Sequence, residues 1–364
     1  MGSARHLALL GDHKARLVPW PVPFADGIPL LLAARGQQVV MLASGDPFCF
    51  GAGSSLMRHL APDEWVAHPA PSAFTLAAAR LGWAVQDMAC LALHAAPLTR
   101  LRPHLTPGRH IVALLRDGGA VAQVAAYLTH MGFGASTLHV LEALGGPRER
   151  VRTSRADAID LADVVHPVAM GIACAGYGGV LPCASGIADD WFDHDGQISK
   201  RPVRALALSA LAPRPGEMLW DIGAGSGSIG IEWLLAHPAN RAIALEADPV
   251  RAARIGANAA GLGVDRIHVM TGRAPELLPQ GVPDAIFIGG GLSDALLEAL
   301  WARSPIGTRL VAHAVTLESE ALLAHWHGAR GGQLLRIELA QAASIGSRRG
   351  WRASYPLVQW CVTL

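Results

Sequence analysis

The chain has 364 residues, of which 51% are hydrophobic and 16% charged, and its formal net charge is +1. This length favours two domains, and so apolar a composition excludes a disordered chain. The nearly neutral charge, without a dense run of Lys or Arg, argues against a nucleic-acid partner, because such a surface has to neutralise phosphates.

The cysteines and the longest uncharged stretch limit where the protein acts. The five cysteines are scattered and never form C-x-x-C, which predicts reduced thiols in the cytoplasm and neither a disulfide framework nor a metal site. Residues 164–188 contain no Asp, Glu, Lys or Arg, as a membrane span would. Glycines and prolines interrupt this stretch repeatedly, so we predict a buried strand, then a loop, and no membrane partner.

The first half alternates apolar runs with turn residues, which predicts an α/β domain in two lobes over residues 1–178. A loop-rich stretch, 179–199, should link it to the second domain. The strands expected in the first half are 37–44, 110–117 and 136–144, and the expected helices are 51–60, 74–82 and 120–132.

The second half, residues 200–364, predicts a doubly wound, Rossmann-like sheet, because strand and helix patterns alternate regularly. Two final strand patterns, 333–342 and 356–364, have no convincing helix between them, so we expect them to close the sheet with an antiparallel last strand. The other expected strands are 217–223, 241–248, 268–272, 285–290 and 309–315, and helices are expected at 202–211 and 229–238.

The stretch WDIGAGSGSIGI, residues 220–231, contains a literal G-x-G-x-x-G with Glu246 about twenty positions later, the pattern of a dinucleotide site. The glycines also form the frame Gly223-x-Gly225-x-Gly227, with Asp221 just before them. A carboxylate at the strand end should repel a pyrophosphate and suit a cationic ligand. S-adenosylmethionine (SAM) carries a sulfonium and an ammonium and no phosphate, and Glu246 should accept hydrogen bonds from its ribose. The pattern therefore favours SAM over a dinucleotide or an empty turn.

Longer motifs carry a family resemblance. GIADDWFDHDGQISKRPVRALALSALAPRPGEMLWDIGAGSGSIGIEW, TGRAPELLP and LVAHAVTLES resemble the decarboxylating C15-methyltransferases of cobalamin biosynthesis. VVMLASGDPFCFGAG, PAPSAFTLAAARLGW and LEALGGPRERVR resemble the C5-methyltransferases of the tetrapyrrole methylase class. Both halves in this order are similar to the fused precorrin-6Y C5,15-methyltransferase family. The resemblance implies an enzyme that methylates precorrin-6B (precorrin-6Y) twice from SAM and removes carbon dioxide from an acetate side chain, giving precorrin-8.

The resemblance also implies which residues bind SAM. Ser199 stands where the family usually has threonine, and Arg273 where it often has aspartate, which leaves the adenine contact of Arg273 open. With the glycine loop, the expected cofactor-binding residues are Ser199, Asp221, Gly223, Ala224, Gly225, Ser226, Gly227, Glu246, Gly272 and Ala274 in the second half, and Gly45, Asp46 and Ser72 in the first.

The start of the chain departs from the family pattern. Tetrapyrrole methylases open with a strand and a glycine-rich loop that borders SAM, whereas RHLALLGD corresponds to the end of the following helix. We therefore expect the first domain to lack one edge of its cofactor site. The hypothesis that follows is impaired C5 methylation with retained C15 chemistry.

Methyl transfer needs orientation more than a nucleophile, but a polycarboxylate substrate should attract cations and a decarboxylation needs a proton donor. Lys200 and Arg201 are the predicted substrate-binding residues, unless they are solvated surface charges. Asp193 and His194 are the predicted catalytic residues, with helix capping as the alternative. Further cationic candidates are Arg204, Arg348, Arg349 and Arg352.

Other functions stay open at this point. They are an RNA, DNA or protein methyltransferase, an NAD-type oxidoreductase, and a non-catalytic scaffold. The segment FIGGG, residues 287–291, lacks the Pro-Pro aromatic motif usual in nucleic-acid amino-methylases. We expect a homo-oligomer that acts on a small tetrapyrrole.

Overall fold

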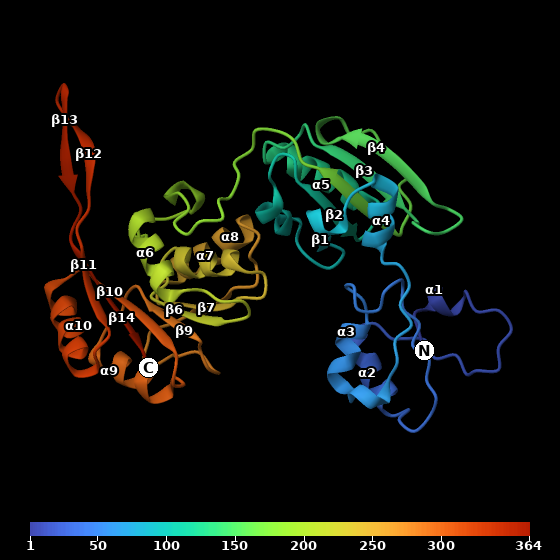
Figure 1. Cartoon of the computed structure of the whole chain (residues 1–364), viewed down its shortest axis with the longest axis horizontal. Helices are drawn as coiled ribbons and strands as arrows, with labels where there is room; N and C mark the ends of the chain where they lie inside the picture. Colours follow the sequence, from blue (N-terminus) through green and yellow to red (C-terminus); the bar gives the residue numbers. More distant parts are fainter. The chain divides into compact units, whose positions relative to one another are not determined.

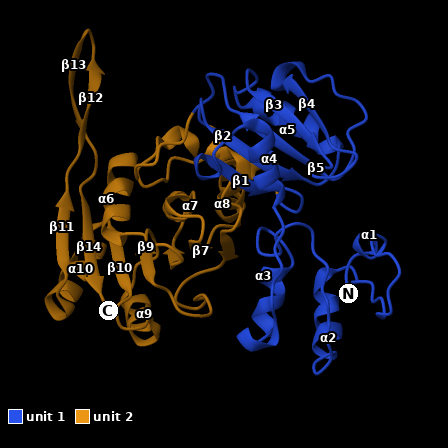
Figure 2. Ribbon diagram, turned by 45° about the vertical axis from the view of Figure 1, so that its right-hand side comes forward, with its two compact units in different colours: residues 1–96, 106–179 blue, residues 97–105, 180–364 orange.

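The computed structural model describes all 364 residues and divides into two compact units, each treated separately (Figure 2). Unit 1 comprises residues 1–96 and 106–179, and unit 2 comprises residues 97–105 and 180–364. The segment 97–105, assigned from the sequence to the first domain, thus groups with the second. No helix combines the length and the apolar character that crossing a bilayer requires.

Unit 2 is built on a seven-stranded sheet with the order β11-β14-β10-β9-β6-β7-β8. The pairs from β8 to β10 are parallel, and β14 runs antiparallel to both of its neighbours. The predicted doubly wound sheet with an antiparallel last strand is confirmed. Its strands are β6 (Met218–Ile222), β7 (Arg241–Glu246), β8 (His268–Thr271), β9 (Ala285–Ile288), β10 (Arg309–Ala314), β11 (Gln333–Ile337) and β14 (Leu357–Thr363).

The two faces of this sheet bury separate cores under separate helices (Figure 1). Successive strand residues point to opposite faces, so Leu219 packs on the side of α6, α7 and α8, whereas Trp220 packs on the side of α9 and α10. Phe287 and Ile288 divide in the same way. The helices are α6 (Arg201–Leu211), α7 (Ser228–Ala236), α8 (Pro249–Gly261), α9 (Asp294–Arg303) and α10 (Leu317–Arg330).

A two-stranded hairpin projects from the sheet between β11 and β14 (Figure 1). It consists of β12 (Ala340–Ile345) and β13 (Arg348–Ala353). The predicted strand 333–342 is therefore wrong in its length, because β11 ends at Ile337 and the chain then enters a separate ladder. Ile345 and Trp351 are 66% and 78% exposed on this hairpin.

A short 3-10 helix, η5 (Leu98–His104), packs against the loop that follows α8. Arg100 Nε donates to Asp265 Oδ1 at 2.8 Å. Gly263 leaves room for the turn, because a Cβ there would lie 2.5 Å from the Thr99 carbonyl oxygen. These contacts explain why 97–105 groups with unit 2.

Unit 1 contains a five-stranded sheet, in the order β1-β2-β5-β3-β4, with α4 and α5. β1 and β2 are parallel and the remaining pairs antiparallel. As expected, α4 stops at Gly82, which has a φ of +67°. The elements are α1 (Ala4–Leu7), α2 (Gly27–Leu32), α3 (Gly53–Leu56), α4 (Ala73–Leu81), β1 (Met88–Ala92), β2 (His110–Leu115), α5 (Gly119–His130), β3 (Thr137–Glu142), β4 (Arg150–Arg155) and β5 (Val168–Ala173).

The predicted strand 37–44 does not form. Its residues are extended, but no neighbouring strand supplies a ladder of hydrogen bonds. The only backbone partner near its centre is Met1, whose amino group donates to the Val40 oxygen at 2.7 Å and whose oxygen accepts from the Leu42 N–H at 2.8 Å.

Candidate active site

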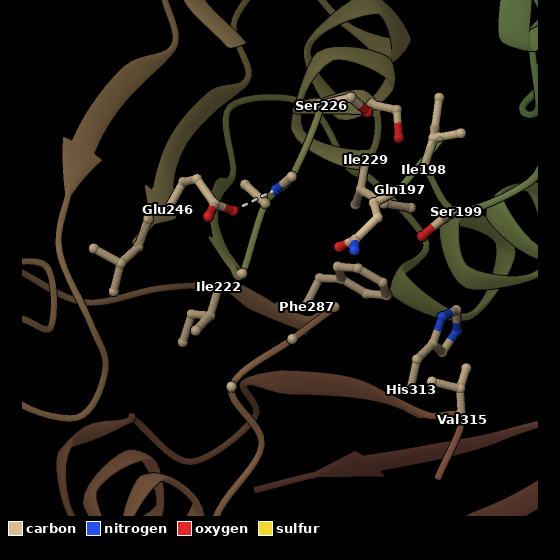
Figure 3. A pocket seen from close by; sticks show the side chains of 18 of the residues that line it. Gln197, Ile198, Ser199, Ile222, Ser226, Ile229, Glu246, Phe287, His313 and Val315 are labelled. Atoms are coloured by element: carbon tan, nitrogen blue, oxygen red, sulfur yellow. Dashed lines mark hydrogen bonds between the residues drawn. The ribbon is translucent and has the colours of Figure 1, made fainter. Parts of the chain in front are cut away.

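Unit 2 has a pocket of about 1060 Å³ at the carboxyl ends of β6, β7, β9 and β10. Strand order reverses around β6, which pairs with β7 on one side and β9 on the other, and ligands of doubly wound sheets bind at such a point. Figure 3 shows Glu246, Phe287 and His313 around this space. The volume lies at the upper end of the roughly 300–1,000 Å³ of common small-molecule sites, so the pocket is large enough for a cofactor.

The glycine loop lines one wall. Gly223 has a φ of +68°, and a Cβ there would lie 2.6 Å from the backbone nitrogen of Gly290. Only glycine allows this turn to pass so close to the segment after β9. Gly225 also has a positive φ, +59°, but a Cβ on it would meet nothing closer than the Gln197 oxygen at 3.5 Å.

Glu246, the last residue of β7, holds the loop from the opposite side. Its Oε2 accepts from the Gly225 N–H at 2.8 Å and its Oε1 from the Asp248 N–H at 3.0 Å (Figure 3). The side chain is buried and lines the pocket. Each carboxylate oxygen keeps a further lone pair, so Glu246 can still accept hydrogen bonds from ligand hydroxyls.

Asp221 lies beneath the loop rather than at its lip. It is 1% exposed, does not line the pocket, and accepts at Oδ2 from the Gly230 N–H of α7 at 2.9 Å. Its Oδ1 has no partner. Burial raises the pKa of this carboxyl from 3.8 to about 7, and the Gly230 hydrogen bond acts in the opposite direction. The predicted contact between Asp221 and a cationic ligand is therefore absent from this geometry.

The structure brings most, but not all, of the predicted residues to the pocket. Gly227 stays outside it because its Cα faces Ile255 of α8, and a Cβ on Gly227 would lie 2.6 Å from Ile255 Cγ2. The predicted residues that line the pocket are Ser199, Lys200, Gly223, Ala224, Gly225, Ser226, Glu246, Gly272 and Ala274, and those that do not are Asp193, His194, Arg201, Asp221 and Gly227.

The two predicted catalytic residues stabilise the loop-rich stretch before α6, residues 179–199, which we call the entry loop. The Asp193 side chain is 78% exposed and lies 3.3 Å from Arg254 Nε, while the Asp193 N–H donates to Asn258 Oδ1 at 2.8 Å. His194 Nδ1 accepts from the Gly196 N–H at 3.0 Å. These contacts give both residues a structural role at the edge of the pocket.

Of the predicted cationic residues, only Lys200 lines the pocket. Arg204 is completely buried, and its guanidinium donates to Glu232, to Asp189 and to the carbonyls of Ile187 and Ser199, so it anchors the entry loop. Arg204 does not line the pocket, so a substrate bound there does not reach its guanidinium. Arg348, Arg349 and Arg352 are exposed on β13 and do not line the pocket, whereas Lys200, Arg251 and Arg273 do.

Unit 1 has its own pocket, of about 1070 Å³, and it brings together Gly45, Asp46 and Ser72. Gly45 has a φ of +56°, and a Cβ there would lie 2.9 Å from the Pro71 oxygen. Asp46 Oδ1 accepts from the Phe48 N–H at 2.8 Å, and Ser72 caps α4 by accepting from the Thr75 N–H at 3.1 Å. The three predicted residues thus shape one cavity.

Sequence reasoning missed His313, which lies inside the unit 2 pocket at the end of β10. The available signal was its place in LVAHAV, where a polar side chain interrupts a buried strand near its carboxyl end. Tyr355 and Arg251 also line the pocket without having been predicted.

Known proteins match both halves. The model of the tetrapyrrole (corrin/porphyrin) methylases matches residues 28–160, and that of the precorrin methyltransferase domain matches residues 190–364. A precorrin-6Y C(5,15)-methyltransferase [decarboxylating] of Sinorhizobium sp is 49% identical over all of this chain and 89% of its own length. A cobalt-precorrin-6B C(15)-methyltransferase (decarboxylating) of Salmonella typhimurium is 31% identical over 44% of this chain and 85% of its own.

Among solved structures, the C-terminal domain of precorrin-6Y C5,15-methyltransferase from Rhodobacter capsulatus is 49% identical, with a TM-score of 0.48, over 50% of this chain and 100% of that one. The Sinorhizobium relative decides the assignment, because its 49% identity extends over both units. The chain is a SAM-dependent methyltransferase and belongs to the decarboxylating precorrin-6Y C(5,15)-methyltransferase family.

Proposed function

We propose that this chain transfers two methyl groups from SAM to a precorrin, at C5 and C15, and removes carbon dioxide from an acetate side chain, in cobalamin biosynthesis. Unit 1 would methylate C5, and unit 2 would methylate C15 and decarboxylate. The observation that carries the proposal is the full-length match to a C(5,15)-methyltransferase, with one pocket in each unit to serve the two transfers.

The unit 2 pocket fits SAM on its own chemistry. Ser226 Oγ is buried in the glycine loop and has no partner, so it offers a free hydroxyl to a ligand. Glu246 offers acceptors for ribose hydroxyls, and Gly272 and Ala274 leave an apolar edge for an adenine. SAM supplies, when bound, a methyl group on a positively charged sulfur. Ser199, Lys200 and the glycine loop would orient it and the substrate.

Mass spectrometry of the products made from precorrin-6B and SAM tests the proposal. Two added methyl groups with loss of carbon dioxide support activity in both units. One added methyl group with loss of carbon dioxide would instead support the hypothesis of impaired C5 methylation with retained C15 chemistry. Gly45→Val, which fills the unit 1 pocket wall, should leave one methyl addition and the decarboxylation, because unit 2 is unchanged. Glu246→Ala should leave the other methyl addition and no decarboxylation. No methylated product from the unmodified chain would refute the proposal.

We also propose that the chain forms a homo-oligomer and acts in the cytoplasm. Support for assembly comes from Ile345 and Trp351, apolar side chains exposed on the hairpin of β12 and β13. Support for the compartment comes from five free cysteines. Light scattering on the full chain and on Trp351→Glu tests the first point: a monomer in both samples would contradict it.

A further inference from the structure

His313 occupies a distinctive place in the unit 2 pocket. It lies on β10 and faces the same space as the glycine loop and Ser199 (Figure 3). The ring is 7% exposed and meets the Phe287 ring edge-on, with centroids 4.9 Å apart. An imidazole this well packed has a fixed orientation, so its two nitrogens have fixed surroundings.

Gln359 determines which ring nitrogen carries the proton. His313 and Gln359 are direct partners in the β10–β14 ladder, and His313 Nε2 lies 2.9 Å from Gln359 Oε1. The amide nitrogen of Gln359 is used elsewhere, since it donates to Cys361 Sγ at 3.3 Å. With the amide in this orientation its oxygen faces Nε2, and because an amide oxygen only accepts, Nε2 donates and Nδ1 carries the lone pair.

The lone pair on Nδ1 is available to a ligand. Nδ1 has no hydrogen-bond partner within the chain, and it is not one of the fully buried polar atoms. Burial lowers the pKa of His313 to about 4, against the smaller opposite effect of the Gln359 hydrogen bond. The ring is therefore neutral at pH 7. Other titratable groups that line the pocket are Lys200, Glu246, Arg251, Arg273, Glu276 and Tyr355.

We propose that His313 Nδ1 accepts a hydrogen bond from an N–H of the tetrapyrrole and stabilises the positive charge that develops on that nitrogen during methyl transfer at C15. This inference rests on the proposed function. As the ring carbon attacks, a π electron pair forms the new C–C bond, the S–CH3 bond breaks, and sulfur keeps its pair. The conjugated ring nitrogen is then electron-poor, and its N–H donates more strongly.

The same charge prepares the second reaction. When the C–CO2 bond breaks, carbon dioxide leaves and the electron pair of that bond neutralises the electron-poor nitrogen through the conjugated system, which leaves an exocyclic C=CH2 group. Its CH2 carbon then takes a proton from water while the newly methylated ring carbon loses its proton to water, so the product stays neutral. A neutral acceptor suits this sequence, because it strengthens as charge appears and releases as charge disappears. His313 is thus an acceptor, and a neutral ring without a proton on Nδ1 does not serve as the acid.

The first test measures the free enzyme. Nitrogen NMR of histidine-labelled full chain should show His313 in the Nε2–H form from pH 6 to pH 8, with Nδ1 unprotonated. Assignment comes from the signal lost in His313→Phe. A proton on Nδ1 would overturn the proposal, whether or not any variant is active.

The second test uses two substitutions at one position. His313→Phe removes the acceptor and should lower kcat for the C15 product about 10- to 100-fold, the range for a hydrogen bond to a charged group. KM for precorrin-6B and calorimetric affinity for SAM should change less than about threefold, because the bond strengthens only in the transition state. His313→Asn keeps an oxygen acceptor and should recover part of kcat.

The outcomes separate the two proposals. Unchanged kcat in His313→Phe, or equal losses in the Phe and Asn variants that both bind SAM normally, would overturn the role of His313 while the proposed function stands. An inactive unmodified chain would refute the proposed function instead, and the NMR result would still decide the protonation of His313.

Discussion

Replacing Asp221 with asparagine isolates one buried charge. The carboxyl is 1% exposed, and its only hydrogen bond is from the Gly230 N–H to Oδ2. Asparagine keeps an oxygen acceptor for Gly230 in a side chain of nearly the same shape. It removes the ionisation whose pKa burial raises to about 7.

The sign of the effect follows from proton uptake. Between the ordinary value of 3.8 and about 7, folded Asp221 is protonated and unfolded Asp221 is ionised. The folded state binds more protons, so the free energy of unfolding falls as pH rises through 7. One pKa unit corresponds to about 1.4 kcal/mol, and over the two units from pH 6 to pH 8 folded Asp221 binds on average about half a proton more than unfolded Asp221. The expected loss of stability is about 1.4 kcal/mol, or about 3–5 °C in Tm.

Thermal unfolding of the ligand-free chain at pH 6 and pH 8 measures this loss. The difference between the unmodified chain and Asp221→Asn cancels all other titrating groups. Asp284→Asn is the matched control, because Asp284 also accepts from one backbone N–H, that of Met218 at 2.7 Å, but is exposed. The control should keep the full pH dependence. An equal fall in Asp221→Asn would show that Asp221 does not bind the extra proton.

Three further comparisons between variants test the site and its framework. Gly223→Ala should lower Tm more than Gly225→Ala. Both substitutions place alanine at a positive φ, which costs about 1–2 kcal/mol, but only a Cβ on Gly223 would lie 2.6 Å from the Gly290 backbone. Equal losses of Tm by differential scanning fluorimetry would contradict this close approach. Glu246→Gln should weaken calorimetric binding of S-adenosylhomocysteine about 10- to 100-fold, whereas Glu276→Gln, exposed in the same pocket, should change it little. Arg204→Met should destabilise unit 2 by about 3–5 kcal/mol in urea unfolding, because Glu232 stays buried and loses its ion-pair partner, Arg204, at 2.5 Å. The double variant Arg204→Met/Glu232→Leu should recover part of that loss. A double variant no more stable than the single one would count against the pairing.

The sequence predicted the sheet of unit 2 well because its strands are apolar, short and separated by clear turns. The closing strand β14 was predicted from the missing helix before it. The hairpin of β12 and β13 was missed because its residues are exposed on both faces, so they show no apolar alternation. Residues 37–44 are the opposite case, a predicted strand that does not form. Their apolar run is typical of a strand, but a strand also needs a pairing partner elsewhere in the chain.

The site was predicted less completely, because its geometry depends on which side a residue faces. Alternation along β6 places Asp221 on the same face as Leu219, which packs under α6, α7 and α8. The period of two in MLWDI therefore points the carboxylate toward α7 and away from the tip of the strand. His313 was missed for a different reason: its significance depends on Gln359, a partner 46 residues away.

The position of Asp221 changes why the loop favours SAM over a dinucleotide. A pyrophosphate needs free backbone N–H groups at the helix start. In the loop before α7, the N–H groups of Gly223 and Ala224 donate to the Leu245 oxygen, at 2.9 and 3.1 Å, and that of Gly225 donates to Glu246. In the first turn of α7, the Gly230 N–H donates to Asp221. A phosphate would have to break these bonds and approach a buried carboxylate. Ribose hydroxyls and an ammonium group bring donors instead, and the loop with Glu246 presents acceptors to them. The loop therefore disfavours a phosphate through these occupied amides and through Glu246, the charged group at the pocket wall.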